Sequence, residues 1–86
     1  LVLIDTGCTV DGYHSDITRT YAFGSPHAEH AEAWAHEREA QQAAFDAVRP
    51  GVPCEEIDAV ARRTLARNGY GPAYRLPGLP HRTGHG

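Results

Sequence analysis

The chain has 86 residues, and its 8 basic and 11 acidic residues leave a net charge of −3 at pH 7. A chain of this length forms one domain at most, and so small a charge does not favour nucleic acid or an anionic membrane surface as a partner. No run of 18 apolar residues occurs, so we expect no membrane-spanning helix.

Cys8 and Cys54 follow neither a disulfide nor a zinc-ribbon spacing, and free thiols favour a cytoplasmic protein. The chain contains no methionine, and both of its ends fall inside stretches expected to carry structure or a site. We therefore expect residues 1–86 to be part of one domain of a longer protein.

Residues 1–23 are expected to form an antiparallel β-hairpin, because the apolar runs 1–4 and 17–23 flank the turn signal Asp11-Gly12. With an even number of loop residues, Asp5 and Asp16 fall on one face of the hairpin, either directly opposite or diagonal to each other. Two carboxylates within roughly 5–8 Å of each other repel unless a positive charge lies between them. The pattern thus predicts a divalent cation at this pair.

Two helices are expected after the hairpin. Residues 27–48 are rich in good helix formers, with Ser25 as a plausible N-cap and Pro26 at the first helical position. The second helix covers residues 55–68 and ends at the C-cap signal Asn68-Gly69. The positions expected to share one face are Trp34, Ala40, Ala44, Ala47 and Val48 in the first helix, and Ile57, Val60, Ala61 and Leu65 in the second.

Residues 70–86 are rich in proline and glycine and are expected to be a loop first and at best a short strand last. An antiparallel β-hairpin followed by two helices and a loop or short strand defines an α+β fold. We expect the helices to pack on one face of the antiparallel sheet.

The closing sequence HRTGHG carries His81 and His85, four positions apart. Pro80, Gly84 and Gly86 oppose a helix here, and in an extended segment the two rings would lie roughly 13 Å apart. They would then not bind the same ion. One histidine could be a metal ligand while the other reaches toward a substrate.

Taken together, LVLIDTG, GYHSDITRTYAFG, PGV, GYG and HRTGHG resemble the pita-bread metallopeptidases. The chain is most similar to the proline-specific branch of that superfamily, the Xaa-Pro dipeptidases and Xaa-Pro aminopeptidases. The spacing of eleven between Asp5 and Asp16 also matches. The resemblance covers nearly all of residues 1–86 and implies that they are a partial pita-bread catalytic domain.

The resemblance implies a role for four residues. Asp5 would chelate one metal ion, Asp16 would bridge two, and His85 would bind the other metal ion. His81 would line the substrate pocket near the scissile bond. The implied cofactor is a pair of divalent ions, with Mn²⁺ preferred and Co²⁺, Zn²⁺ or Fe²⁺ as possible occupants.

The implied reaction is hydrolysis of Xaa-Pro peptide bonds by a dinuclear-metal-dependent exopeptidase, with a peptide carrying proline at its second position as substrate. The two glutamate ligands of the family come after the point where this sequence stops, so we expect the 86 residues alone to be inactive. Three alternatives stay open: a methionine aminopeptidase-like enzyme, a non-catalytic pita-bread module that binds proteins, and a truncated folding unit whose strand edges drive homo-oligomerisation or strand exchange.

Overall fold

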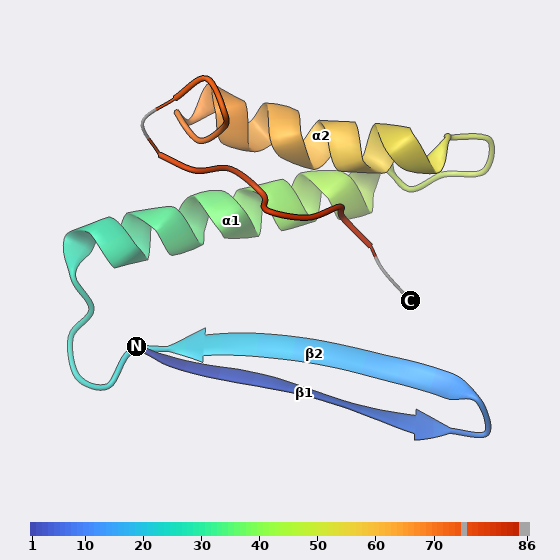
Figure 1. The fold of residues 1–86 in the computed structure, drawn as a ribbon, viewed down its shortest axis with the longest axis horizontal. Coiled ribbons are helices and arrows are strands. Elements are labelled where there is room, and N and C mark those ends of the chain that lie inside the picture. Colours follow the sequence, from blue (N-terminus) through green and yellow to red (C-terminus); the bar gives the residue numbers. More distant parts are fainter. Residues whose placement is uncertain (75, 85–86) are drawn as a thin grey trace. The chain divides into compact units, whose positions relative to one another are not determined.

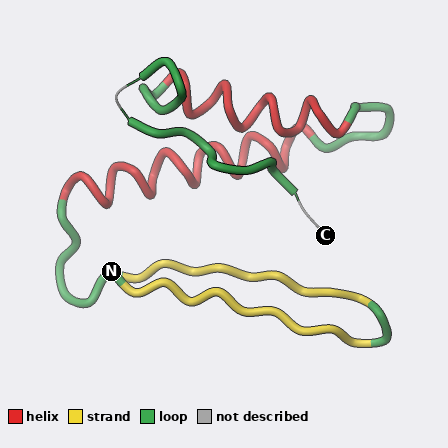
Figure 2. The backbone as a smooth tube through the Cα atoms, in the orientation of Figure 1, coloured by secondary structure: helices red, strands yellow, loops and turns green. Residues whose placement is uncertain are grey.

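The computed structural model describes residues 1–74 and 76–84, and its fold class is α+β, as predicted. The element order is β1 (Val2–Val10), β2 (Tyr13–Tyr21), α1 (Ala28–Ala47) and α2 (Cys54–Arg67) (Figures 1 and 2). The chain divides into two compact units. The first is Leu1–Ala31, and the second contains the described residues from Glu32 onward. Neither described helix is both long and apolar enough to cross a membrane.

The first unit contains the predicted antiparallel hairpin. Asp11 (φ 52°) and Gly12 (φ 82°) form its two-residue turn, and positive φ at both positions is the signature of a type I′ turn, whose twist matches that of the strands. Each strand has nine residues, so pairing extends well beyond the apolar runs that suggested it. In this register Asp5 is paired with Thr18 and Gly7 with Asp16.

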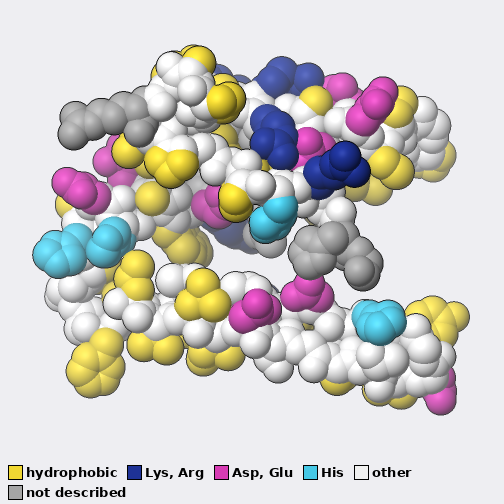
Figure 3. All heavy atoms as spheres, viewed as in Figure 1, with side chains coloured by type: hydrophobic (Ala, Val, Ile, Leu, Met, Phe, Trp, Pro, Cys, Tyr) yellow, Lys and Arg dark blue, Asp and Glu magenta, His cyan; other side chains and the backbone are white. Residues whose placement is uncertain are grey.

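The hairpin has a polar face and a more apolar face, because side chains alternate along each strand. The polar face carries Asp5 and Asp16, while Ile4, Ile17 and Arg19 lie on the other. Every residue of both strands is exposed in the structure, and Figure 3 shows hydrophobic side chains at the surface along the hairpin. A two-stranded ribbon is at best marginally stable by itself, so the hairpin depends on further cover for its stability.

Helix α1 begins at Ala28, and the N–H of Ala31 donates to the carbonyl of His27 over 3.0 Å. The prediction that Ser25 caps this helix was therefore wrong: the connection continues through Pro26, and His27 takes the cap position. Only Ala40 and Ala44 of α1 are buried.

Two members of the face predicted for the first helix are exposed, with Trp34 at 56% and Val48 at 63% of their accessible surface. The buried positions of α1 are Ala40 and Ala44, which follow Glu39, a residue that bonds the end of α2. The apolar face of α1 is thus shorter than the sequence suggested.

Helix α2 agrees with its predicted bounds to within one residue and buries Ala61, Thr64 and Leu65. The N–H of Gly69 bonds the Ala66 carbonyl over 3.0 Å, and the N–H of Tyr70 bonds the Leu65 carbonyl over 2.9 Å. With Gly69 at φ 89°, these bonds form a Schellman motif that satisfies the last carbonyls of the helix. The C-cap signal at Asn68-Gly69 is confirmed.

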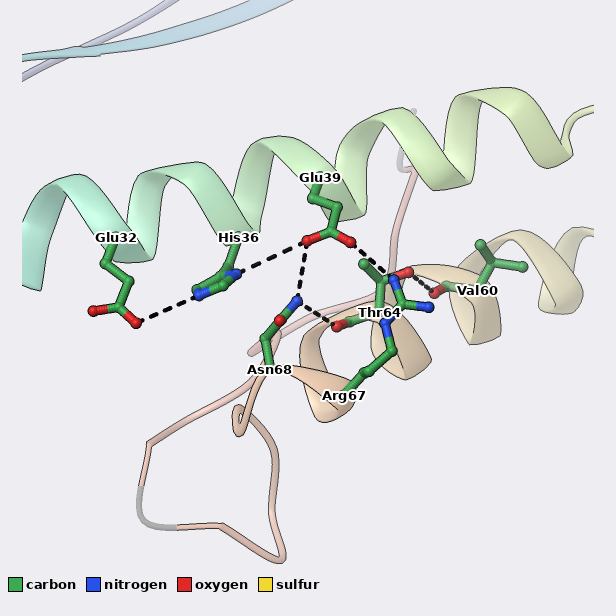
Figure 4. Close-up of polar contacts among 7 residues, drawn as sticks. All are labelled: Glu32, His36, Glu39, Val60, Thr64, Arg67 and Asn68. Atoms are coloured by element: carbon green, nitrogen blue, oxygen red, sulfur yellow. Dashed lines mark hydrogen bonds and ion pairs between the residues drawn. The ribbon is translucent and has the colours of Figure 1, made fainter.

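Glu39 connects α1 with the C-terminal end of α2 (Figure 4). Its carboxylate accepts hydrogen bonds from Arg67 at 2.8 Å and from Asn68 at 3.1 Å, and His36 lies 3.9 Å away. The Arg67 guanidinium, and next the Asn68 amide, hold the pKa of Glu39 below its usual value. The second unit is thus an α-helical hairpin with a polar contact at one end.

The described residues 70–74 and 76–84 form no helix and no strand, only turns, bends and one isolated bridge. Tyr70 and Leu76 make an isolated parallel bridge, and the N–H of Gly71 donates to the Leu76 carbonyl over 3.0 Å. A Cβ on Gly78 would lie 3.0 Å from the Cα of Gly71, so glycine permits this close backbone approach. Among residues 76–84 no strand is formed.

Candidate metal and substrate site

The structure places Asp5 and Asp16 on the same face of the hairpin, as predicted, and selects the diagonal arrangement. Asp5 is directly opposite Thr18, and Asp16 is directly opposite Gly7. Diagonal neighbours of this kind have their backbones roughly 7–8 Å apart, which is within reach for two side chains that share a ligand. The register of the two strands sets this diagonal relation.

The partners of these two carboxylates are suited to a metal site. The Thr18 hydroxyl donates to Oδ1 of Asp5 over 3.0 Å, which orients that carboxylate. Gly7 contributes no side chain opposite Asp16. Arg19 lies on the other face and donates to the backbone carbonyl of Thr18 over 2.8 Å. On the hairpin, the negative charge of the pair is therefore not neutralised by this arginine.

Oxygen donors of this kind suit hard divalent cations, so the pair fits the predicted type of cofactor. Within residues 1–74 and 76–84, no group of three or more His, Cys, Asp or Glu side chains is arranged to hold a metal ion. The third predicted ligand, His85, lies outside the described residues. The described part of the site is thus two carboxylates on one ribbon.

His14, the histidine of the hairpin, is exposed on the same face as Asp16. Its Nδ1 lies 3.0 Å from the Thr9 hydroxyl, so a cross-strand contact occupies one ring nitrogen. Cys8 and Cys54 are both free thiols.

His81 belongs to the second unit and is exposed, with its Nδ1 3.0 Å from the carbonyl of Arg82. Its backbone carbonyl accepts a hydrogen bond from Nη2 of Arg62 over 2.9 Å. Asp5 and Asp16 belong to the first unit. The two predicted aspartate ligands thus lie in the first unit, and the predicted substrate-pocket residue His81 lies in the second.

Two residues near His81 were missed by sequence reasoning. Arg62 and Asp58 lie one turn apart on α2 and form an ion pair of 2.7 Å. Besides the bond to His81, Arg62 donates to the Leu79 carbonyl over 3.2 Å, and Asp58 accepts from the Thr83 N–H over 2.7 Å. In the sequence, Asp58 and Arg62 are simply an acidic and a basic residue four positions apart on a helix. This spacing usually indicates an ordinary ion pair on the helix surface.

Asp58 is held in its charged form by these partners. The Arg62 hydrogen bond, and next the Thr83 backbone N–H, lower the pKa of Asp58 to about 2, against the smaller opposing effect of desolvation. The carboxylate is therefore an acceptor throughout the neutral range.

An apolar hollow of about 710 Å³ lies between α2 and the loop that follows it. Leu79 and Pro80, which line it, lead directly into His81. Its other apolar lining residues include Leu65, Tyr70, Pro72, Tyr74 and Pro77. The backbone segment that leads into His81 therefore also lines this apolar hollow.

Metallopeptidase family M24 matches residues 1–86, and the chain belongs to this family. Its relatives include the "Xaa-Pro dipeptidase" of Lactobacillus helveticus, which is 46% identical over 86 residues. The "Probable dipeptidase PepE" of Mycobacterium tuberculosis (strain ATCC 25618 / H37Rv) is 46% identical over 87 residues. An uncharacterized peptidase of Staphylococcus aureus (strain bovine RF122 / ET3-1) is 41% identical over 85 residues.

These matches cover nearly the whole of this chain but only part of each relative. They span 100% of the chain and 22% of the first two relatives, and 99% of the chain and 23% of the third. The expected resemblance to metallopeptidases is confirmed, and the presence of an Xaa-Pro dipeptidase among the relatives supports the predicted branch.

Proposed function

We propose that the chain is part of the catalytic domain of a metal-dependent exopeptidase that hydrolyses Xaa-Pro peptide bonds. The observation that carries the proposal is the placement of Asp5 and Asp16 on one face of the hairpin, with Thr18 orienting the first carboxylate. Membership of a metallopeptidase family and the name of the Lactobacillus relative support the reaction and the substrate.

In this proposal Asp5, Asp16 and His85 would hold two divalent ions. The ions would lower the pKa of a bound water and polarise the scissile carbonyl. Thr18 holds the Asp5 carboxylate in one orientation, as partners of metal ligands commonly do. His81 lines the pocket near the peptide bond that is cleaved.

The proposal extends to the cofactor and to what lies outside these 86 residues. Mn²⁺ is the preferred ion, because the implied ligand set combines several carboxylate oxygens with one imidazole. Two glutamate ligands are expected outside residues 1–86, so the 86 residues alone should not turn over an Xaa-Pro dipeptide. The proposed location is the cytoplasm, and the proposed substrate is a short peptide with proline at its second position.

The test compares Asp16→Asn and Asp5→Asn with the control Asp11→Asn in the full-length protein. Asp11 is a third aspartate of the same hairpin, and Asn-Gly is also a favoured type I′ turn, so this change removes a charge without disturbing the turn. Bound metal is measured by elemental analysis after dialysis, and turnover is measured with Ala-Pro, Ala-Ala and Met-Ala-Ala.

We expect the two test variants, Asp16→Asn and Asp5→Asn, to lose both the bound metal and Ala-Pro hydrolysis. The control Asp11→Asn should keep both. Preference for Met-Ala-Ala would instead favour a methionine aminopeptidase-like enzyme. A wild-type protein that binds no divalent metal and cleaves none of the three peptides would contradict the proposal and favour a non-catalytic binding module.

A further inference from the structure

The ion pair between Asp58 and Arg62 differs from the other ion pairs of α2, because it also bonds the backbone of a distant segment. Arg62 uses three different nitrogens: Nε for Asp58, Nη1 for the Leu79 carbonyl and Nη2 for the His81 carbonyl. Asp58 uses one oxygen for Arg62 and the other for the Thr83 N–H. By contrast, the Arg63–Glu56 ion pair of 2.6 Å stays within the helix.

The bonded backbone groups occupy alternate positions, 79, 81 and 83. The two side chains together supply two donors and one acceptor to three backbone groups spread over residues 79–83. Backbone groups outside a sheet need such partners, and residues 79–83 belong to no described strand.

The geometry gives this contact rigidity. The guanidinium is planar, so its Nη1 and Nη2 donors keep a fixed spacing that matches two carbonyls at once. The Asp58 side chain is 23% exposed, which limits competition from water at the carboxylate, whereas the Arg62 side chain is exposed at 43%. The pKa of Asp58, about 2, keeps the acceptor charged at neutral pH.

We propose that Asp58 and Arg62 are positioning residues: together they hold the backbone of residues 79–83 on α2 and so fix where the His81 side chain is presented. The bond to the carbonyl of His81 itself is the direct link. An effect of this placement of His81 on catalysis rests on the proposed function. The attachment of residues 79–83 to α2 does not depend on it.

The test uses the full-length protein with Asp58→Ala, Arg62→Lys and the control Arg63→Gln. A lysine at position 62 can still pair with Asp58, but its single ammonium cannot span two carbonyls as the guanidinium does. Arg62→Lys thus keeps the charge and the helix while it removes the two-carbonyl contact. If Asp58→Ala fails to fold, Arg62→Lys decides the test alone. Arg63→Gln removes an ion pair from the same helix without touching residues 79–83.

Three readouts are combined. Exchange of the Thr83 amide should become at least about tenfold faster in Asp58→Ala, because this N–H loses its hydrogen bond to a charged group. It should also become faster in Arg62→Lys, where the carbonyls of Leu79 and His81 lose the guanidinium that holds the segment on α2. The NMR signal of the His81 ring, assigned by its absence in His81→Gln, should move in both. The kcat for Ala-Pro should fall about 10–100-fold with little change in KM, as expected for a misplaced group near the reacting bond. Arg63→Gln should match the wild type in all three.

Unchanged exchange and an unmoved His81 signal in Arg62→Lys would overturn the proposal. Faster exchange with an unmoved His81 signal and unchanged kcat would overturn it too, because the segment would then be held without any effect on the histidine. If the wild type cleaves no peptide, the proposed function fails, and the exchange and NMR readouts still decide whether the segment is held.

Discussion

Gly7 lies directly opposite Asp16 in the hairpin, and the position has no room for a side chain. A Cβ on Gly7 would collide with the backbone carbonyl oxygen of Ser15. A backbone atom in a paired strand cannot move aside as a flexible side chain can. The glycine thus permits the close pairing of the strands and adds no side chain opposite Asp16.

Gly7→Ala should therefore weaken the hairpin. We expect a loss of about 1–3 kcal/mol in the free energy of unfolding, the usual range when a group is forced into filled space. Urea unfolding of the full-length protein measures the loss, and hydrogen exchange of residues 2–21 locates it. The control Thr20→Ala changes a residue on the same face without adding an atom. Equal stability of Gly7→Ala and the wild type would show that the strands can separate to accommodate a methyl group.

Thr18→Val should weaken metal binding while leaving the fold intact. Valine has nearly the shape of threonine but cannot donate to Oδ1 of Asp5, so the carboxylate loses the bond that orients it. Loss of such a partner commonly costs about 10–100-fold in metal affinity, and titration calorimetry with Mn²⁺ measures the change. Thr20→Val, two residues along the same face, is the matched control. Equal affinities for the two variants would contradict a role for Thr18 in holding the ligand.

The hairpin is the part of this structure that the sequence predicts best, because local signals determine it. A type I′ turn requires positive φ at two successive positions, and Asp-Gly is one of the residue pairs that favour this turn. Asp11 and Gly12 both adopt positive φ. Any even number of loop residues then places Asp5 and Asp16 on one face. Only the choice between opposite and diagonal needed the structure. The C-terminus of α2 was equally predictable, since Gly69 adopts the left-handed conformation that a helix end favours.

Other features could not be predicted because they depend on contacts between distant residues. Arg62 meets carbonyls 17 and 19 residues away, and Asp58 meets an N–H 25 residues away. A pattern with a period of a few residues carries no information about such separations. The exposure of Trp34 was missed for the same reason, since the sequence shows that α1 has an apolar face but not how much of it is covered.

The Asp58 contact should be lost in acid. Because the folded-state pKa of about 2 lies below the usual value of 3.8, the charged form stabilises the folded protein above about pH 4, and this contribution disappears as the pH falls toward 2. The difference in urea midpoint between the wild type and Asp58→Asn should therefore be constant from pH 7 to 5 and shrink below pH 4. A difference that stays constant down to pH 3 would show that the charge of Asp58 does not stabilise the fold.

Glu39→Gln should loosen the contact between α1 and the end of α2. The two carboxylate oxygens of Glu39 both face donors, Arg67 at 2.8 Å and Asn68 at 3.1 Å. Glutamine has one oxygen and one NH₂ group, so a donor would face a donor at one of these two contacts. Because the contact is exposed, we expect a modest effect, about two- to fivefold faster hydrogen exchange in residues 64–70. Glu37→Gln, an exposed change two residues away on the same helix, should leave this exchange unaltered. If both variants exchange equally fast, Glu39 does not hold the helices together, and burial of Ala40, Ala44, Ala61 and Leu65 alone accounts for their association.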